Sequence, residues 1–164
     1  MINYIFCDTD IGSALIAQKN NKVCALILGD NKTDMLKELY KGFSDEIFTE
    51  KEVPNNIDTA ALDVIKNPYG PNYVPLHLTG TQFQLKVWEH LKTIPAGKTE
   101  TYSEVAQYLG HTQSHRAVAN ACANNKIAIL IPCHRVVNKD KKLTGYRWGA
   151  EFKRKLLEKE QKRG

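Results

Sequence analysis

The chain has 164 residues, of which 42% are hydrophobic, and a formal net charge of +5. This length suits one domain of ordinary size or two small ones, and the hydrophobic content is enough to build a core. No apolar stretch approaches the roughly 20 residues that span a bilayer, and the first ten residues lack the basic start and long apolar centre of a signal peptide. We therefore expect a globular cytoplasmic protein that is not bound to a membrane.

The positive charge is confined to one part of the chain. Residues 1–75 hold 7 Lys and Arg against 11 Asp and Glu, a net charge of −4, whereas residues 76–164 hold 16 against 7, a net charge of +9. A basic half of this kind suits a polyanion such as nucleic acid, and a solvated lysine-rich surface is the alternative. If the partner is DNA, we expect binding that is independent of sequence and weakened by salt.

The four cysteines are widely spaced along the chain, at Cys7, Cys24, Cys122 and Cys133. They form neither a disulfide framework nor a CxxC metal pair, so we expect reduced thiols. Cys7 and Cys24 have no histidine before His77 to share a zinc ion with. We predict no metal and no cofactor.

The first elements in chain order predict an α+β region. Residues 2–9, 12–19 and 22–29 are short β-rich runs separated by turn residues. Residues 31–43 follow as a helix that stops at Gly42, and residues 55–67 form a second helix that is capped near Asn56 or Asp58. Cys7 and Cys24 lie in strands, where packing is their expected role. The segment PYGPN, residues 68–72, is the predicted boundary region, and we divide the chain after Pro75.

The remaining elements are predicted to be helical. A helix over residues 79–94 begins with a threonine cap, and the runs 101–110 and 114–125 follow, capped by Ser103 and Ser114. Two short helices joined by a tight turn, here HTQ at residues 111–113, suit a helix-turn-helix or an ordinary helical hairpin. Alanines make the second of these helices thin, as close approach to a groove requires. A cationic helix over residues 150–162 ends the chain.

The stretch ILIPCHRVV, residues 129–137, places a cysteine beside a histidine and an arginine. Free cysteine is often a buried packing residue. A thiol beside two potential cations is also the environment that lowers a cysteine pKa and creates a nucleophile. From Cys133, His134 and Arg135 alone, both interpretations stay open.

Five ordered blocks between Gly80 and Glu160 carry a family resemblance: TYSEVAQYLG, RAVANACANN, IPCHRVV, LTGYRWG and LLEKE. Together they resemble the O6-alkylguanine-DNA alkyltransferases, and the wording is especially similar to the bacterial adaptive-response members of that family. The resemblance implies an RNase H-like α+β domain at residues 1–75. It also implies a mainly helical alkyltransferase domain at residues 76–164 with a winged-helix-like helix-turn-helix.

The resemblance also implies a suicide reaction, in which an alkyl group passes from O6-alkylguanine, or from O4-alkylthymine, to the protein. Cys133 would be the nucleophile, His134 would accept its proton through a water, Glu160 would orient the imidazole, and Tyr102 would protonate the departing guanine. The remaining pocket residues implied are Asn125, Val136, Tyr146, Arg147 and Trp148. The product is a thioether with no route for removing the alkyl group, so we expect one turnover. We also expect the protein to act as a monomer.

DNA contacts are implied for Ser114, Arg116, Ala117, Ala119, Asn120 and Arg135. The resemblance places the second short helix in the minor groove of double-stranded DNA, with Arg116 filling the space that a flipped nucleotide leaves. Asn120 departs from the small residue that is usual at its position in the family.

Three other classes stay as alternatives: a damage-recognition protein that does not react, a helix-turn-helix regulator, and a cysteine hydrolase. A damage-recognition protein of this kind lacks a reactive cysteine, and a helix-turn-helix regulator does not need the PCHR motif. A cysteine hydrolase needs an oxyanion hole, which no motif in the sequence indicates. The chain has no cysteine cluster for a phosphate-damage sensor domain, so we predict repair without transcriptional regulation.

Overall fold

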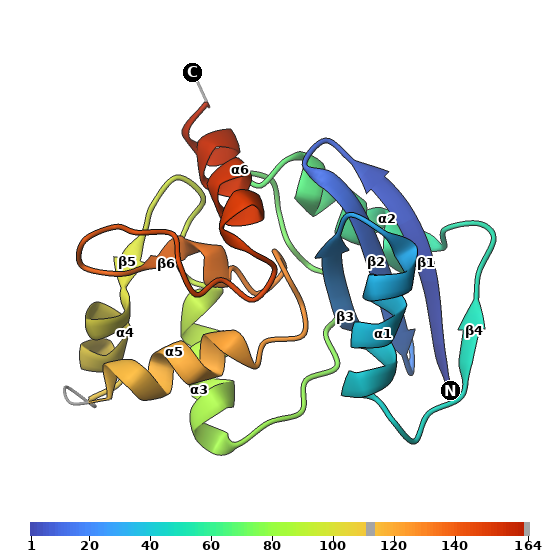
Figure 1. Ribbon diagram of the computed structural model, residues 1–164, viewed down its shortest axis with the longest axis horizontal. Helices are drawn as coiled ribbons and strands as arrows, with labels where there is room; N and C mark the ends of the chain where they lie inside the picture. The colour runs from blue at the N-terminus through green and yellow to red at the C-terminus, as the bar shows by residue number, and fades with distance from the viewer. Residues whose placement is uncertain (111–113, 163–164) are drawn as a thin grey trace. The chain divides into compact units, whose positions relative to one another are not determined.

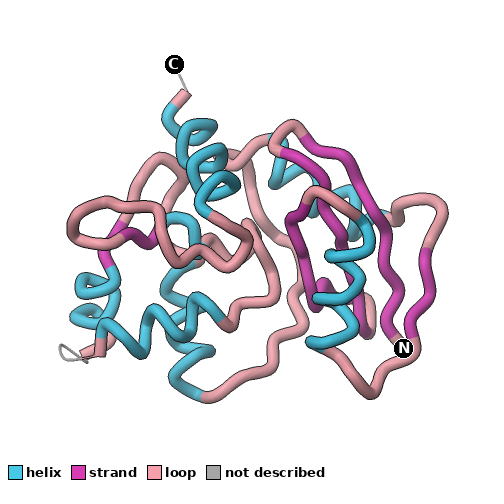
Figure 2. The backbone as a smooth tube through the Cα atoms, in the orientation of Figure 1, coloured by secondary structure: helices cyan, strands magenta, loops and turns pink. Residues whose placement is uncertain are grey.

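The structure is a computed structural model that describes residues 1–110 and 114–162. Its helices and strands form the mixed α+β architecture that the sequence predicts (Figures 1 and 2). Two compact units divide the chain: Met1–Leu78 with Lys126–Leu130, and Thr79–Asn125 with Ile131–Gly164. None of the described helices is both long enough and apolar enough to cross a membrane.

The first unit is built on a four-stranded sheet in the order β3-β2-β1-β4. Three strands form an antiparallel meander with the predicted bounds: β1 (Ile2–Thr9), β2 (Gly12–Lys19) and β3 (Lys22–Gly29). Asn20 and Asn21 join β2 to β3 with φ angles of 53° and 60°, which asparagine tolerates better than most residues. The short β4 (Phe48–Glu50) pairs parallel to β1 and was not predicted.

Two helices cover the sheet. In Figure 1, α1 (Lys32–Gly42) lies in front of the sheet and α2 (Asn56–Lys66) lies behind it. The inner strand β2 and the edge strand β3 are both buried along most of their length. The Gly42 stop is confirmed. The cap of α2 is Asn55, because Asn55 and Asp58 exchange side-chain to backbone hydrogen bonds in a capping box, with Asp58 inside the helix.

A buried polar network ties α2 to the sheet. The Asp58 carboxylate is fully buried and accepts hydrogen bonds from Gln18 Nε2 at 2.7 Å and from the Asn55 backbone N–H at 2.9 Å. Lys51 forms an ion pair with the same carboxylate. This network is stable because each charged or polar member has partners inside the fold.

A short excursion from the second half of the chain belongs to the first unit. The segment Lys126–Leu130 lies alongside β3. There the Leu26 backbone N–H donates to the Lys126 carbonyl at 3.0 Å, and the Leu26 carbonyl accepts from the Ala128 N–H at 2.9 Å. Residues 76–78 also belong to this unit, through the pairing of Val23 with Leu76. Sequence analysis had placed both segments in the second part.

The second unit holds the remaining elements: α3 (Gln82–Leu91), β5 (Glu100–Thr101), α4 (Tyr102–Tyr108), α5 (His115–Ala123), a 3-10 turn η1 (Cys133–Arg135), β6 (Val136–Val137) and α6 (Ala150–Gln161). Thr81 caps α3, as expected of a threonine. Thr101 rather than Ser103 caps α4, because its side chain forms a capping box with Glu104. Ser114 occupies the N-cap of α5 without a side-chain capping bond. Residues 111–113 lie outside the described residues, so the helix-turn-helix stays a prediction.

Candidate active site

Cys133 lies at the first position of the 3-10 turn η1, directly before β6. The turn is held by its own backbone, since the Cys133 N–H donates to the Ile131 carbonyl at 2.8 Å and the Arg135 N–H donates to the Pro132 carbonyl at 3.0 Å. Only 3% of Cys133 is exposed. Asn125 Nδ2 donates both to the thiol sulfur at 3.2 Å and to the Ile131 carbonyl at 3.1 Å. Asn125 therefore fixes the position of the sulfur.

The resting state of Cys133 is a neutral thiol. Burial raises the pKa of Cys133 well above its usual value, and the neighbouring Cys122 raises it further, against smaller lowering effects from Asn125 and Lys153. Of the two interpretations left open for Cys133, the effect of burial on the pKa prevails over that of nearby cations. A nucleophilic thiolate therefore needs a base that removes the proton during the reaction.

His134 is that candidate base, and its side chain is fully buried. Its Nε2 lies 2.8 Å from Glu160 Oε2, on α6. Among the described residues His134 Nδ1 has no hydrogen-bond partner. With Nε2–H donating to the carboxylate, Nδ1 carries the lone pair that can accept a proton.

The pKa values of this pair favour a neutral histidine beside an ionised glutamate. Burial lowers the pKa of His134, although the Glu160 carboxylate opposes that shift. Burial also acts to raise the pKa of Glu160, but hydrogen bonds and charges from His134 and Arg135 outweigh it and lower the pKa to about 2. The arrangement matches a nucleophile, a base and a carboxylate that orients the base.

Arg135 has a different position from the one expected of a DNA-binding residue. Its guanidinium donates to both Glu160 carboxylate oxygens, at 3.0 Å and 2.9 Å, and to the Ile94 carbonyl at 2.7 Å. Only 8% of the residue is exposed. A phosphate contact would break these buried hydrogen bonds. In this structure Arg135 instead holds the Glu160 carboxylate in place next to His134.

Aromatic side chains from two segments lie near the thiol. Tyr146 and Trp148 are each 8% exposed and pack edge to face, with ring centroids 5.4 Å apart. The Tyr146 hydroxyl is buried without a partner among the described residues, and burial raises its pKa well above the usual value. Burial also raises the pKa of Tyr102 to about 12, with the Cys122 and Cys133 sulfurs adding to the shift. Both phenols are therefore protonated donors at neutral pH.

Lys153 is a site residue that sequence analysis missed. Its side chain is 1% exposed, and its Nζ donates to the Val136 carbonyl at 2.6 Å and lies 5.9 Å from the centre of the Tyr146 ring. Burial lowers the pKa of Lys153, while the Cys122 and Cys133 sulfurs raise it. A lysine on a lysine-rich helix gives no sequence signal of burial. The only available clue was its place between the apolar Phe152 and Leu156.

The residues expected to contact DNA lie mainly on α5. Arg116, Asn120 and Ala123 are exposed at helical spacing on one side of α5, while Val118, Ala121 and Cys122 are buried on the other. Ala117 and Ala119 are half-buried, and so is Ser114 at the N-cap. The exposed side of α5 is thus narrow and carries one cation.

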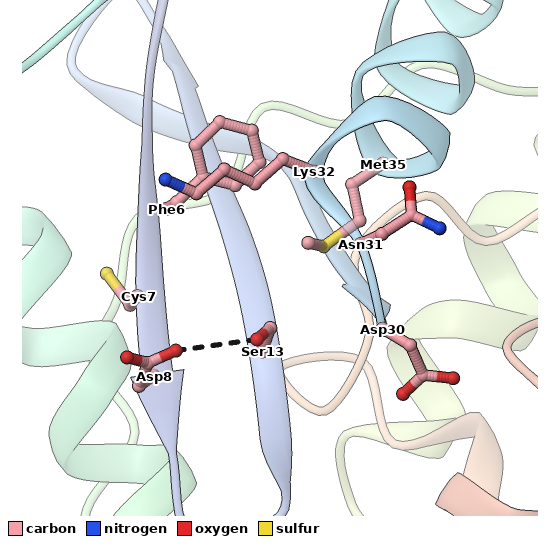
Figure 3. Close-up of a pocket in the computed structure, with 8 residues that line it drawn as sticks. All are labelled: Phe6, Cys7, Asp8, Ser13, Asp30, Asn31, Lys32 and Met35. Atoms are coloured by element: carbon pink, nitrogen blue, oxygen red, sulfur yellow. Dashed lines mark hydrogen bonds between the residues drawn. The ribbon is translucent and has the colours of Figure 1, made fainter.

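A separate hollow occurs in the first unit, with a volume of about 260 Å³ (Figure 3). Its lining includes Cys7 and Asp8 of β1, with Ser13 donating to Asp8 at 3.4 Å. Burial raises the pKa of Cys7, followed by the charge of Asp58, and no histidine lines the hollow to act as a base. Among the described residues, no three His, Cys, Asp or Glu side chains are grouped to hold a metal ion. We therefore place the candidate site at Cys133.

The fold and the site define a class of protein: an α+β chain with a buried cysteine thiol, and a histidine–carboxylate pair that could serve as its base, in a helical unit. The family model of the 6-O-methylguanine DNA methyltransferase DNA-binding domain matches residues 82–162, which include every member of this site.

Relatives match over nearly the whole chain. Escherichia coli Ada, a bifunctional transcriptional activator and DNA repair enzyme, is 38% identical over 97% of this chain, which spans 45% of Ada. A methylated-DNA–protein-cysteine methyltransferase of Candida albicans is 38% identical over 96% of this chain and 95% of its own length. The Mycobacterium tuberculosis OGT solved in complex with DNA has a TM-score of 0.80 and 33% identity, covering 99% of this chain and 94% of that one. The chain belongs to the 6-O-methylguanine DNA methyltransferase family.

Proposed function

We propose that this chain repairs DNA in the cytoplasm by moving a methyl or other alkyl group from O6-alkylguanine, and from O4-alkylthymine, to its own Cys133. The observation that carries the proposal is the buried thiol held by Asn125 beside a His134–Glu160 pair, inside the segment that matches the family. Alkyl transfer needs this arrangement because a neutral thiol is a poor nucleophile toward an ether-like carbon.

In the proposed reaction, His134 Nδ1 takes the thiol proton, directly or through one water molecule. The Cys133 sulfur then forms a bond to the alkyl carbon while the bond from that carbon to guanine O6 breaks. The electron pair leaves with guanine, which receives a proton from the Tyr102 hydroxyl, and the proton held by His134 returns to Tyr102 through solvent. Overall, the thiol proton ends on guanine and Cys133 becomes a thioether.

Charged groups around the site stabilise the proton transfer. Ionised Glu160 stabilises the imidazolium that forms at His134, and the Lys153 ammonium offsets the developing thiolate. The thioether has no activated leaving group, so each molecule reacts once. No step of the proposed reaction requires a cofactor.

We propose double-stranded DNA as the partner, bound by the protein as a monomer through the exposed side of α5. An O6-alkyl group is out of reach in a stacked base pair, so the nucleotide must rotate out of the helix. Arg116, exposed in the first turn of α5, would fill the space left behind. Ser114, Ala117, Ala119 and Asn120 would face the minor groove, which is about 6 Å wide. The two helices α4 and α5 would act as a helix-turn-helix.

The test is the mass of the intact protein after mixing with duplex DNA that contains one O6-methylguanine. We expect a gain of one methyl group, which peptide mapping places on Cys133, and a yield that never exceeds one methyl per protein molecule. A protein that binds the DNA without any gain in mass would be a damage-recognition protein, and the proposal would be wrong.

A further inference from the structure

The C-terminal end of α5 is held by the side chain of its own C-cap residue and by side chains from elsewhere in the second unit. The last carbonyls of a helix lack partners within it and carry partial negative charge. Here the Trp88 indole on α3 donates to the Ala121 carbonyl at 2.9 Å, and Asn124 Nδ2 donates to the Asn120 carbonyl at 2.8 Å. The last turn of α5 contains no basic residue of its own.

Arg147 supplies the missing cation from a distant part of the sequence. Its Nη1 donates to the Asn125 carbonyl at 3.0 Å and to the Ala123 carbonyl at 3.3 Å. The same guanidinium lies 5.5 Å from the centre of the Trp148 ring, within the range of a cation–π interaction. One planar group therefore contacts both the end of α5 and the Trp148 ring, which packs against Tyr146.

The backbone position of Arg147 strengthens this link. Arg147 stands between Tyr146 and Trp148, whose buried rings pack edge to face, while Asn125 places its side chain on the Cys133 sulfur. Asn125 thus contacts the Cys133 sulfur with its side chain, and its backbone carbonyl accepts a hydrogen bond from Arg147. Movement of the end of α5 would be transmitted to the thiol and to both aromatic rings.

We infer that Arg147 is a positioning residue that couples the DNA-facing helix α5 to the pocket wall made by Tyr146 and Trp148. The inference rests on the proposed function. In this view the Arg147 side chain contacts neither the alkyl group nor a phosphate. It sets how closely the wall surrounds the base, and it lets α5 and the wall respond together when DNA binds.

The first test uses the free bases O6-methylguanine and O6-benzylguanine, which react without engaging α5. We expect Arg147→Met to slow methyl transfer by about tenfold, because small misplacement of a pocket wall is costly, and to lower the methyl-to-benzyl rate ratio severalfold. Arg147→Lys, which keeps the charge and one donor, should recover part of both. A normal rate and ratio combined with weaker binding to undamaged DNA would identify Arg147 as a phosphate contact and overturn the inference.

Two matched variants control this test. Trp88→Phe removes another donor from the same helix end without touching the wall, and we expect the methyl-to-benzyl ratio to stay normal. Arg154→Met removes an exposed cation from α6 and gives the effect of charge alone on DNA affinity. An equal change of ratio in Trp88→Phe would show that any loss at the helix end disturbs the pocket, and the specific link through Arg147 would be wrong.

A second test does not depend on alkyl transfer. The chain has two tryptophans, so Trp88→Phe leaves Trp148 as the single tryptophan, which excitation selective for indole reports. Undamaged duplex DNA should shift the Trp148 emission in this background, and adding Arg147→Met should abolish the shift while DNA still binds. If the protein accepts no alkyl group but this shift depends on Arg147, the proposed reaction fails and the coupling stands. An emission shift that persists without Arg147 would overturn the coupling.

Discussion

Two buried ionic networks, one in each unit, show how a structural network differs from a reactive one. In the first unit, the fully buried Asp58 carboxylate meets Gln18, Lys51 and Asn55. None of these four residues has a buried side-chain nitrogen or oxygen left without a partner. Such a network stabilises one arrangement of α2 on the sheet.

The network of the second unit is similar in composition but incomplete. The buried Glu160 carboxylate meets His134 and Arg135, while His134 Nδ1 and the neighbouring Tyr146 hydroxyl have no partner among the described residues. Unsatisfied buried polar groups are costly, so they persist where a substrate or a proton completes them. Burial and charge are common to both networks, so the feature that distinguishes the proposed reactive one is His134 Nδ1, an unsatisfied acceptor in the residue that follows the Cys133 thiol.

The largest expected effect comes from the nucleophile itself. Cys133→Ser should abolish alkyl transfer and keep DNA binding, because serine preserves the shape of the turn but lacks a sulfur nucleophile. The measurement is methyl incorporation by mass, with DNA affinity measured in parallel. Separate serine variants of Cys7, Cys24 and Cys122 should still accept a methyl group. A methylated peptide that contains one of these three cysteines would contradict the assignment.

The same substitution applied to the two networks tests the comparison directly. Glu160→Gln should slow methyl transfer by about a hundredfold or more, since His134 loses the carboxylate that orients it and stabilises its charged form. Asp58→Asn should leave the transfer rate of the folded protein near normal. Glu160→Gln leaves the buried Arg135 without its carboxylate and should lower the free energy of unfolding by about 3 to 5 kcal/mol, whereas Asp58→Asn leaves the half-buried Lys51 unpaired and should cost less.

Urea titration and single-turnover kinetics on free O6-methylguanine, run well below the melting temperature, separate the two effects. If Asp58→Asn slowed transfer as much as Glu160→Gln, both networks would affect the site equally and the proposed distinction would be lost.

Much of the fold follows from local sequence signals. The three strands of the meander and the stops of α1 and α2 were predictable because their apolar period and turn residues agree with the final packing. β4 was missed since its three residues, one half-buried and two exposed, are too few to show an alternating pattern, and its only strand partner among the described residues is β1. The placement of Lys126–Leu130 against β3 was equally invisible, because long-range pairing leaves no local pattern.

The site was predictable in its motif but not in its geometry. PCHR and Glu160 were identified through the family resemblance, whereas the direction of the Cys133 pKa shift stayed open because the degree of burial cannot be read from neighbours in sequence. Arg135 was expected to contact DNA and Lys153 was not identified, for a related reason: a basic residue gives no sequence signal of burial until its buried partner is known. In both cases that partner, Glu160 or the Val136 carbonyl, is distant in sequence.

A next prediction concerns the exposed side of α5. Arg116→Ala should slow repair of O6-methylguanine in duplex DNA by about a hundredfold, since filling the vacated space offsets an unstacking cost of a few kcal/mol. Reaction with the free base should stay near normal, because no nucleotide has to rotate. Rates on the two substrates, compared at one salt concentration, check this. Equal losses on both would show that Arg116 supports the pocket instead.

The unsatisfied histidine also predicts a pH dependence. Burial lowers the pKa of His134 below about 6.5, so transfer from the free base should be constant above that pH and fall by about tenfold for each unit below the lowered pKa. The free energy of unfolding should change in the same direction with pH. The lowered pKa of His134 makes the folded state more stable above about pH 6.5, and this contribution is lost as the pH falls through the folded pKa. His134→Gln should remove this part of the stability profile. An unchanged profile would exclude His134 as its source.

The smallest effect is expected at Trp148, which we expect to limit the size of the alkyl group that the site accepts. The indole is 8% exposed and packs against Tyr146, so it occupies room that a bulky alkyl group would need. We expect the unchanged protein to prefer methyl over benzyl, and Trp148→Gly to improve reaction with O6-benzylguanine severalfold, consistent with the 1 to 3 kcal/mol that pocket size contributes to discrimination. Trp148→Phe is the matched control, because it keeps an aromatic wall and should retain the preference for methyl. Both variants lose packing, so their melting temperatures must be compared before their rates. A glycine variant that folds and gains nothing with the benzyl substrate would make Trp148 a packing residue, and the size limit would then have to come from Tyr146 or from the turn at Cys133.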